Sequence, residues 1–219
     1  TAAQLAEVKG TIVRNVAPTG MGVLNAADPL VAEMAQTCPG SVTFFARDRH
    51  HPLMAAHRVR GNRVVFEDGG AIVAVQGNVE HRFALRDIPF TNEGQLGFQV
   101  ENAMAAIAAV WALGLDWTRV RAGLQTFSTD AAGVPGRFNV SYHRGATVIA
   151  DYGHNPDAMI ALVEAVESIP ARRRSVVISG AGDRRDIDLS DQTRILGQAF
   201  DDVVLYQDAC QRGRADGEV

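Results

Sequence analysis

The chain has 219 residues, of which 47% are hydrophobic and 21% are charged. This composition is typical of a globular protein and excludes an intrinsically disordered one. No apolar run is long enough to cross a bilayer, and the first residues contain neither the basic nor the apolar part of a secretory signal. The two cysteines, Cys38 and Cys210, lie far apart and match neither a disulfide framework nor a zinc site. We therefore predict a cytoplasmic protein that does not insert into a membrane.

The charge of the chain narrows the classes of ligand. A formal net charge of -4 at pH 7 argues against a nucleic-acid partner, because nucleic-acid-binding proteins usually concentrate positive charge. Lys9 is the only lysine among the 21 basic residues. A Walker-type phosphate loop needs Gly-Lys-Ser or Gly-Lys-Thr, and Lys9 stands in neither sequence. Any ATP chemistry must therefore take its phosphate loop from outside residues 1–219.

Hydrophobic periodicity and turn residues predict a mixed α/β unit over the first 135 residues. The residues expected to form it alternate between helical spacing, β-branched runs and glycine-containing turns. In chain order they are a helix through Val13, strands over 21–25 and 41–46 around a short helix from 29 to about 36, an antiparallel meander within 58–87, and helices over 97–113 and 117–127.

A linker rich in small residues, glycine and proline over 129–136 precedes a second unit. The pattern after it is strand, loop, helix, strand, loop, helix, strand, which predicts a parallel sheet with right-handed crossovers. Ligands of such sheets lie beyond the carboxyl ends of the strands. We therefore expect function in the loops that follow Ala150, Ser179 and Tyr206.

The first of these loops, 151–155, contains an acid and a histidine. Asp151 stands where a carboxylate accepts hydrogen bonds from a pair of ribose hydroxyls, and His154 stands within reach of a phosphate. The alternative is local: Asp151 caps the following helix, and His154 is satisfied by a neighbour.

The second and third loops carry paired arginines. Loop 182–186 reads Gly-Asp-Arg-Arg-Asp, in which Asp183 and Arg184 offer a carboxylate and forked donors beside a glycine. The third glycine of a dinucleotide fingerprint is missing, so that motif is unsupported. The third loop, 211–218, again places arginines beside glycines. The alternative for loop 182–186 is a solvated Asp–Arg ion-pair cluster, and the alternative for loop 211–218 is an ordinary surface turn.

Two further groups stand in the first unit. Asn102 lies near the start of the apolar helix, where an amide reaches the N6 and N7 edge of adenine, although it is equally an ordinary helix residue. His50, His51 and His57 suggest a metal site, but no acid or cysteine falls at ligand spacing. A solvated loop is the better interpretation of this segment.

Taken as a set, the motifs resemble those of the Mur ligase superfamily. They are Leu-Asn-Ala-Ala-Asp-Pro over 24–29, the Asn102 helix, Val-Pro-Gly-Arg-Phe over 134–138, Asp-Tyr-Gly-His-Asn-Pro over 151–156, and loop 182–186. The resemblance covers essentially the whole chain. It implies an α/β protein in which residues 1–135 are the C-terminal portion of the central ATP-binding domain, without its phosphate loop. Residues 136–219 are then the Rossmann-like C-terminal domain with its parallel sheet, truncated before its end.

The resemblance also implies roles for individual residues. Asn102 resembles the adenine-contacting Asn, Arg137 the nucleotide-contacting Arg of the hinge motif, and Asp151 the ribose-binding acid. His154, Asp183 and Arg184 would face the acyl-phosphate and the incoming amino acid, with His154 as a catalytic residue as well.

Lys9 resembles a second catalytic residue, the lysine that is carbamylated in muramyl ligases and helps to hold Mg²⁺. A neutral amine in a partly buried site adds carbon dioxide, and the resulting anion is a hard oxygen ligand that suits Mg²⁺. The alternative is a solvated lysine on a helix.

The implied activity is ATP-dependent amide formation. The sequence of loop 182–186 most closely resembles that of one branch of the superfamily. The enzymes of this branch use ATP and Mg²⁺ to join arginine, through an acyl-phosphate, to the side-chain carboxylate of an aspartate-containing polymer primer. Without a phosphate loop the chain alone would be inactive. The alternatives are a muramyl or folylpolyglutamate-type ligase and a non-catalytic nucleotide-binding module.

No nucleic acid or membrane is expected as a partner, and the unpaired edges of an incomplete sheet suggest association into a homo-oligomer.

Overall fold

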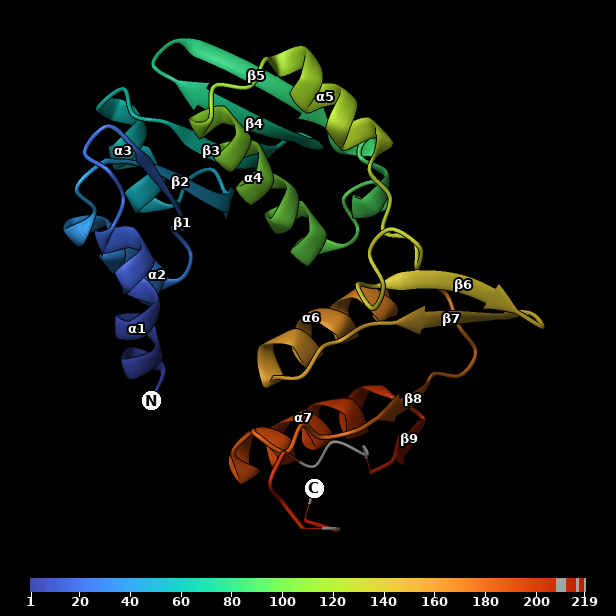
Figure 1. The fold of residues 1–219 in the computed structure, drawn as a ribbon. Helices are drawn as coiled ribbons and strands as arrows, with labels where there is room; N and C mark the ends of the chain where they lie inside the picture. Colours follow the sequence, from blue (N-terminus) through green and yellow to red (C-terminus); the bar gives the residue numbers. More distant parts are fainter. Residues whose placement is uncertain (208–211, 216, 219) are drawn as a thin grey trace. The chain divides into compact units, whose positions relative to one another are not determined.

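The computed structural model describes residues 1–207, 212–215 and 217–218, and Figure 1 shows the chain coloured along its sequence. The chain divides into two compact units, Thr1–Ser128 and Thr129–Val219. Within the described residues, no helix has the length and apolar character that crossing a membrane requires.

The first unit contains one five-stranded sheet and its covering helices, and its elements follow the predicted order. Short 3₁₀ turns lie at 34–37, 85–87 and 89–91. The regular elements are α1 (Ala2–Arg14), β1 (Met21–Asn25), α2 (Pro29–Glu33), β2 (Ser41–Asp48), α3 (Pro52–Val59), β3 (Val64–Asp68), β4 (Ala71–Gln76), β5 (Val79–Ala84), α4 (Gly97–Ala112) and α5 (Trp117–Thr126).

The strand order of this sheet is β1-β2-β3-β4-β5. The first three strands are parallel because α2 and α3 cross between them, whereas β3, β4 and β5 form the predicted antiparallel meander. Gly69 and Gly70 join β3 to β4 at φ values of 56° and 72°, a left-handed conformation that glycine adopts without strain.

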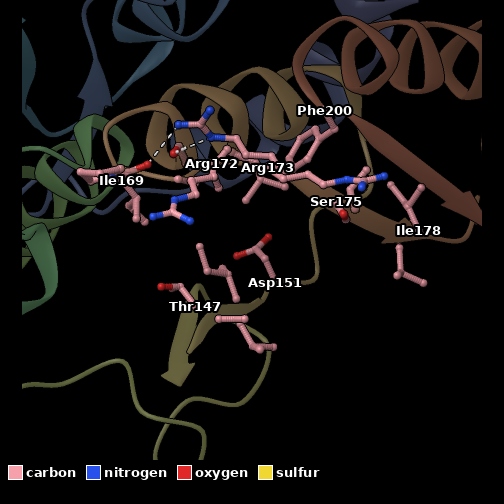
Figure 2. Close-up of a pocket in the computed structure, with 18 of the residues that line it drawn as sticks. Thr147, Asp151, Ile169, Arg172, Arg173, Ser175, Ile178 and Phe200 are labelled. Atoms are coloured by element: carbon pink, nitrogen blue, oxygen red, sulfur yellow. Dashed lines mark hydrogen bonds between the residues drawn. The ribbon is translucent and has the colours of Figure 1, made fainter. Parts of the chain in front are cut away.

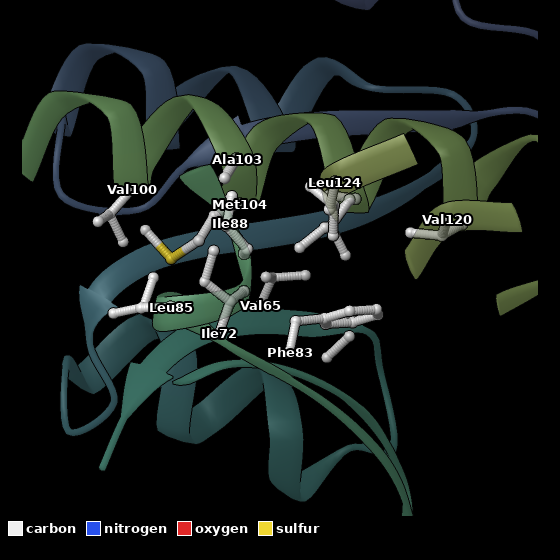
Figure 3. Close-up of a cluster of buried hydrophobic side chains, with 13 residues drawn as sticks. Val65, Ile72, Phe83, Leu85, Ile88, Val100, Ala103, Met104, Val120 and Leu124 are labelled. Carbon is white, nitrogen blue, oxygen red and sulfur yellow. The ribbon is translucent and has the colours of Figure 1, made fainter. Parts of the chain in front are cut away.

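Both faces of the five-stranded sheet are buried. Side chains alternate along a strand, so Val65, Ile72 and Phe83 face one way and Val64 and Phe66 face the other. The first set packs against α4 and α5, as Figure 3 shows. The second set packs with residues of α1, α2 and α3. The sheet is therefore the middle layer of this unit.

One segment of the first unit differs from the expectation. Residues 50–57 were expected to form a solvated loop, but α3 begins at Pro52, a residue whose fixed φ suits the first position of a helix. Met54 is buried in the core, and the His57 ring lies edge-on to Phe44 with Nε2 2.8 Å from the Val42 carbonyl oxygen. The helix forms because a parallel β2–β3 pair needs a crossover.

The second unit alternates strands and helices, which confirms the α/β class. Its elements are β6 (Asn139–His143), β7 (Ala146–Ala150), α6 (Pro156–Glu167), β8 (Ser175–Ile178), α7 (Asp186–Ala199) and β9 (Asp202–Leu205). Strands β8 and β9 form a parallel pair, and α6 contacts α7. The single parallel sheet expected from the sequence is only partly formed, because β7 lies in a separate two-stranded sheet and does not pair with β8. Strand β6, which the sequence pattern does not predict, pairs antiparallel with β7 through a turn at Arg144 and Gly145.

Candidate functional site

The loop after β7 is organised by the Asp151 carboxylate. Its Oδ1 accepts a hydrogen bond from the Gly153 N–H at 2.7 Å, and its Oδ2 accepts one from the Phe138 N–H at 2.8 Å. The carboxylate therefore ties loop 151–155 to the hinge before β6. A carboxylate offers about four lone-pair sites, so two remain for hydroxyl donors of a ligand.

His154 and Asn155 complete this loop. The Nδ1 atom of His154 lies 2.9 Å from the Tyr152 carbonyl oxygen, and the two rings are tilted with centroids 5.2 Å apart. Asn155 caps α6, because its Oδ1 accepts from the Ala158 N–H at 2.8 Å. The predicted alternative that Asp151 caps this helix is therefore wrong, since Asn155 takes that position.

The hinge before β6 is held by Asn139, a buried residue that sequence reasoning missed. Its Oδ1 accepts from the Gly136 N–H at 2.6 Å, and its side-chain nitrogen donates to the carbonyls of Thr129 and Val134. Phe138 is buried and has a φ of 50°. Arg137, which stands between Gly136 and Phe138, is exposed. No hydrogen bond or ion pair joins its guanidinium to the described residues. The hinge thus presents a guanidinium beside the Asp151 loop.

Loop 182–186 follows β8 and begins with a turn in which the Arg184 N–H donates to the Ala181 carbonyl at 2.9 Å. Asp183 pairs with Arg212 at 2.7 Å, whereas the Arg184 Nε lies 3.9 Å from the Asp183 carboxylate. That Nε is buried and has no hydrogen-bond partner among the described residues. Arg185 turns away to Asp188, at 2.6 Å, and its hydrogen bond holds the pKa of the Asp188 carboxyl below its ordinary value.

The third predicted loop packs on loop 182–186. Arg214 donates to the carbonyls of Gly182 and Arg184 and to the Asp186 carboxylate. Gln211 and Asp216 of this loop, like Cys210, lie outside the described residues. The alternative of a solvated ion-pair cluster at loop 182–186 is therefore incomplete, and Arg214 does not lie in an ordinary surface turn, because it bonds to the backbone of that loop.

A cavity of about 890 Å³ lies within the second unit between β7 and β8. Figure 2 shows Thr147 and Asp151 on one side of it and Arg172, Arg173 and Ser175 on the other. Aliphatic side chains of β7, α6 and β8 form much of the wall. Asp151 is thus the predicted site residue that borders this cavity.

The remaining candidates belong to the first unit. The helix α4 begins at Gly97, so Asn102 lies in its second turn, exposed, with its side-chain nitrogen 3.1 Å from the Gln99 Oε1. Lys9 is exposed on α1, and no hydrogen bond or ion pair joins its ammonium group to the described residues.

Among the described residues, no group of three or more His, Cys, Asp or Glu side chains that could hold a metal ion is found. Lys9 is exposed rather than partly buried, so a Mg²⁺ ligand at this position stays a prediction.

Residues 136–218 match the family model described as Mur ligase, glutamate ligase domain. Most of the second unit is therefore similar to that domain, and the resemblance that the motifs carry is confirmed.

Curated relatives extend the match to the whole chain. The chain is 36% identical to the cyanophycin synthetase of Synechocystis sp. and 34% identical to that of Geminocystis herdmanii. Both alignments cover 100% of this chain and 25% of the relative, so the chain spans about a quarter of their length. The resemblance that loop 182–186 carries therefore extends over the whole chain to relatives named cyanophycin synthetase.

A solved structure agrees with the fold. The folylpolyglutamate synthase of Mycobacterium tuberculosis, complexed with ADP and AMPPCP, has a TM-score of 0.62 and 23% identity. The likeness covers 93% of this chain and 42% of that one, and it shows that the fold is shared.

Proposed function

We propose that this chain is part of an ATP-dependent ligase that joins arginine to the side-chain carboxylate of an aspartate-containing polymer. One observation carries the substrate side of the proposal. The loop after β8 presents Arg184 with a buried Nε that has no partner among the described residues, beside the Asp183 carboxylate. An arginine in this state is suited to a carboxylate ligand, which its planar fork binds with two parallel hydrogen bonds.

The nucleotide is bound by three residues in this proposal. Asp151 accepts the ribose hydroxyls with its two remaining lone pairs, Arg137 contacts the nucleotide, and Asn102 contacts adenine through its amide. The exposure of Asn102 and Arg137 supports their availability. The phosphate loop comes from outside residues 1–219, so the chain alone is inactive.

The chemistry has two steps. The γ-phosphoryl group of ATP passes to a carboxylate oxygen of the aspartate side chain and gives an acyl-phosphate and ADP. The amine of arginine then attacks the acyl carbon, which forms the amide bond and releases inorganic phosphate and a proton. No nucleophilic side chain is needed, because positioning and charge neutralisation supply the catalysis. His154 and Asp183 face the acyl-phosphate and the incoming amino acid in this arrangement, and Arg184 holds the amino acid's carboxylate.

The test measures ATP turnover by the complete protein that carries this segment. We expect turnover to depend on arginine and on an aspartate-containing primer, and not on UDP-muramyl substrates or folates. Arg184→Lys keeps the charge but loses the fork, so the KM for arginine should rise about tenfold while the KM for ATP changes little. Arg194→Lys, an exposed arginine paired with Asp191 on α7, is the matched control.

Three results would contradict the proposal in different ways. A response to muramyl or folate substrates would assign the chain to those ligases. Nucleotide binding without ATP turnover would indicate that the chain is a non-catalytic nucleotide-binding module. Equal rises of both KM values in Arg184→Lys would place loop 182–186 at the nucleotide.

A further inference from the structure

Arg214 makes three hydrogen bonds to one loop that is distant in sequence. Its Nε donates to the Gly182 carbonyl at 2.8 Å, its Nη1 to the Asp186 carboxylate at 2.7 Å, and its Nη2 to the Arg184 carbonyl at 2.5 Å. The Arg214 side chain is 23% exposed, whereas that of Asp186 is 88% exposed. Because charged donors to backbone carbonyls are stronger than neutral ones, the two carbonyl bonds fix the shape of the loop, and the solvated ion pair adds little.

The acids around loop 182–186 are each paired with a different arginine. Arg212 bonds Asp183, Arg214 bonds Asp186, and Arg185 bonds Asp188. The Arg184 guanidinium is left at 3.9 Å from its nearest acid, without a hydrogen bond to the described residues. Arg212 thus makes the close bond to Asp183, through Oδ2, whereas Arg184 stays at 3.9 Å from Oδ1 of the same carboxylate.

We propose that Arg214 is a positioning residue, which clamps loop 182–186 so that the guanidinium of Arg184 is held ready for the carboxylate of the amino-acid substrate. Arg212 assists by engaging Asp183. The identity of the substrate rests on the proposed function, but the clamp itself does not. Lysine at position 214 would keep the positive charge near Asp186 but could not donate to two separated carbonyls at once.

The first experiment measures amide hydrogen exchange in the complete protein, without substrate. The Arg184 N–H, which donates to Ala181, is the reporter of the loop. In Arg214→Lys the exchange rate of the Arg184 N–H should rise about tenfold, because the loss of one hydrogen bond lowers the free energy of local opening. Arg194→Lys is the control, since its side chain pairs only within α7 and should leave the loop unchanged. Unchanged exchange in Arg214→Lys would overturn the proposal.

The second experiment separates positioning from general stability by kinetics. Arg214→Lys should raise the KM for arginine about tenfold and leave the KM for ATP within about twofold, as a displaced substrate-binding side chain requires. Arg212→Lys should raise the KM for arginine by less, because it keeps one bond to Asp183. If turnover proves independent of arginine while exchange still accelerates, the proposed function fails and the clamp stands. If exchange accelerates but no substrate KM changes, the clamp is structural only and the positioning role is wrong.

Discussion

The two units differ in where their hydrophobic side chains lie. In the first unit every residue of β4 from Ala71 to Val75 is buried, and both faces of the sheet are covered. In the second unit the strands expose apolar side chains, and Val177 and Leu205 are 66% and 61% exposed. The described buried hydrophobic residues of that unit are Phe138, Met159, Ala165, Val166 and Leu196.

This contrast indicates two ways of positioning functional residues. Asn102 stands on α4, a helix that close packing holds on the central sheet. The loops of the second unit are instead held by hydrogen bonds that the Asn139 and Asp151 side chains accept and that the Arg214 side chain donates. Elements with few buried contacts open more readily, and binding loops are usually drawn from them. We therefore expect core changes to affect the first unit most and polar changes to act on the second.

The aromatic residues allow each unit to be observed separately. Both tryptophans, Trp111 and Trp117, lie in the first unit, and the three tyrosines, Tyr142, Tyr152 and Tyr206, lie in the second. Tryptophan fluorescence therefore reports unfolding of the first unit, and tyrosine fluorescence reports the second.

The largest effect is expected from Phe83→Ala. Phe83 is buried, and its ring lies 5.8 Å from that of Trp117. Its removal leaves a cavity in the core and should lower the free energy of unfolding of the first unit by about 3–5 kcal/mol. Denaturant titration followed by tryptophan fluorescence measures this, with the 59% exposed Val79 of the same strand changed to Ala as the control. An equal shift of the tyrosine signal would contradict the separation of the units.

A smaller effect is expected from Met159→Ala in the second unit. Met159 is buried on α6, and its Cε lies 2.6 Å from the position that a Cβ on Gly153 would take. The cavity adjoins a loop that can relax, so we expect a loss of about 2–3 kcal/mol, the lower part of the range for such changes. Tyrosine fluorescence measures it. Ile160→Ala, at a half-exposed neighbouring position, should change stability much less.

Much of the fold could be predicted because the signals were local. The strand Met21–Asn25 and the helix from Gly97 follow from side-chain periodicity over a few residues. Helix α3 was missed because His50 and His51 before Pro52 read as a polar loop. Strand β6 was missed because most of its residues are exposed, so no buried face produces a pattern.

The candidate site could be predicted only in part. The loops that follow the strands indicated Asp151, Asp183 and Arg184, and the resemblance supplied their roles, but their hydrogen-bond and ion-pair partners are set by tertiary contacts. Arg214 reaches residues 28 to 32 positions away. Local spacing carries no information on such contacts, although the Arg-Gly-Arg sequence at 212–214 did mark the loop that makes them.

The next smaller effect concerns Asp151, the acid that both shapes the hinge and faces the proposed ribose. In the complete protein, Asp151→Ala should raise the KM for ATP by the equivalent of about 1.5–3 kcal/mol, the range for a hydrogen bond to a charged group. The KM for arginine should change less. Steady-state kinetics measure both, and Asp157→Ala, an exposed acid in the first turn of α6, is the control. Unchanged ATP kinetics in a folded variant would leave Asp151 only its hinge role.

The smallest expected effect is the acid dependence that Asp202 contributes to the second unit. Hydrogen bonds from Arg173, at 2.6 Å, and from Ser175 lower the pKa of the Asp202 carboxyl from 3.8 to about 2. A pKa that is lower in the folded state stabilises it above the unfolded pKa, and this contribution is lost as the pH falls toward the folded pKa. The difference in thermal midpoint between the natural protein and Asp202→Asn should therefore be constant above about pH 5 and shrink between about pH 4 and pH 2.

The pair is largely solvent-exposed, so the difference at neutral pH should be small. Tyrosine fluorescence measures the midpoints, and Glu164→Gln removes an exposed carboxylate of α6 that lacks an arginine partner among the described residues. A difference for Asp202→Asn that stays constant down to about pH 2 would mean that the Arg173 bond does not favour the ionised carboxyl in the folded protein. The Asp202 charge would then contribute nothing to the stability of the second unit. The polar contribution to that stability would come only from hydrogen bonds to the backbone, such as those of Asn139 and Arg214.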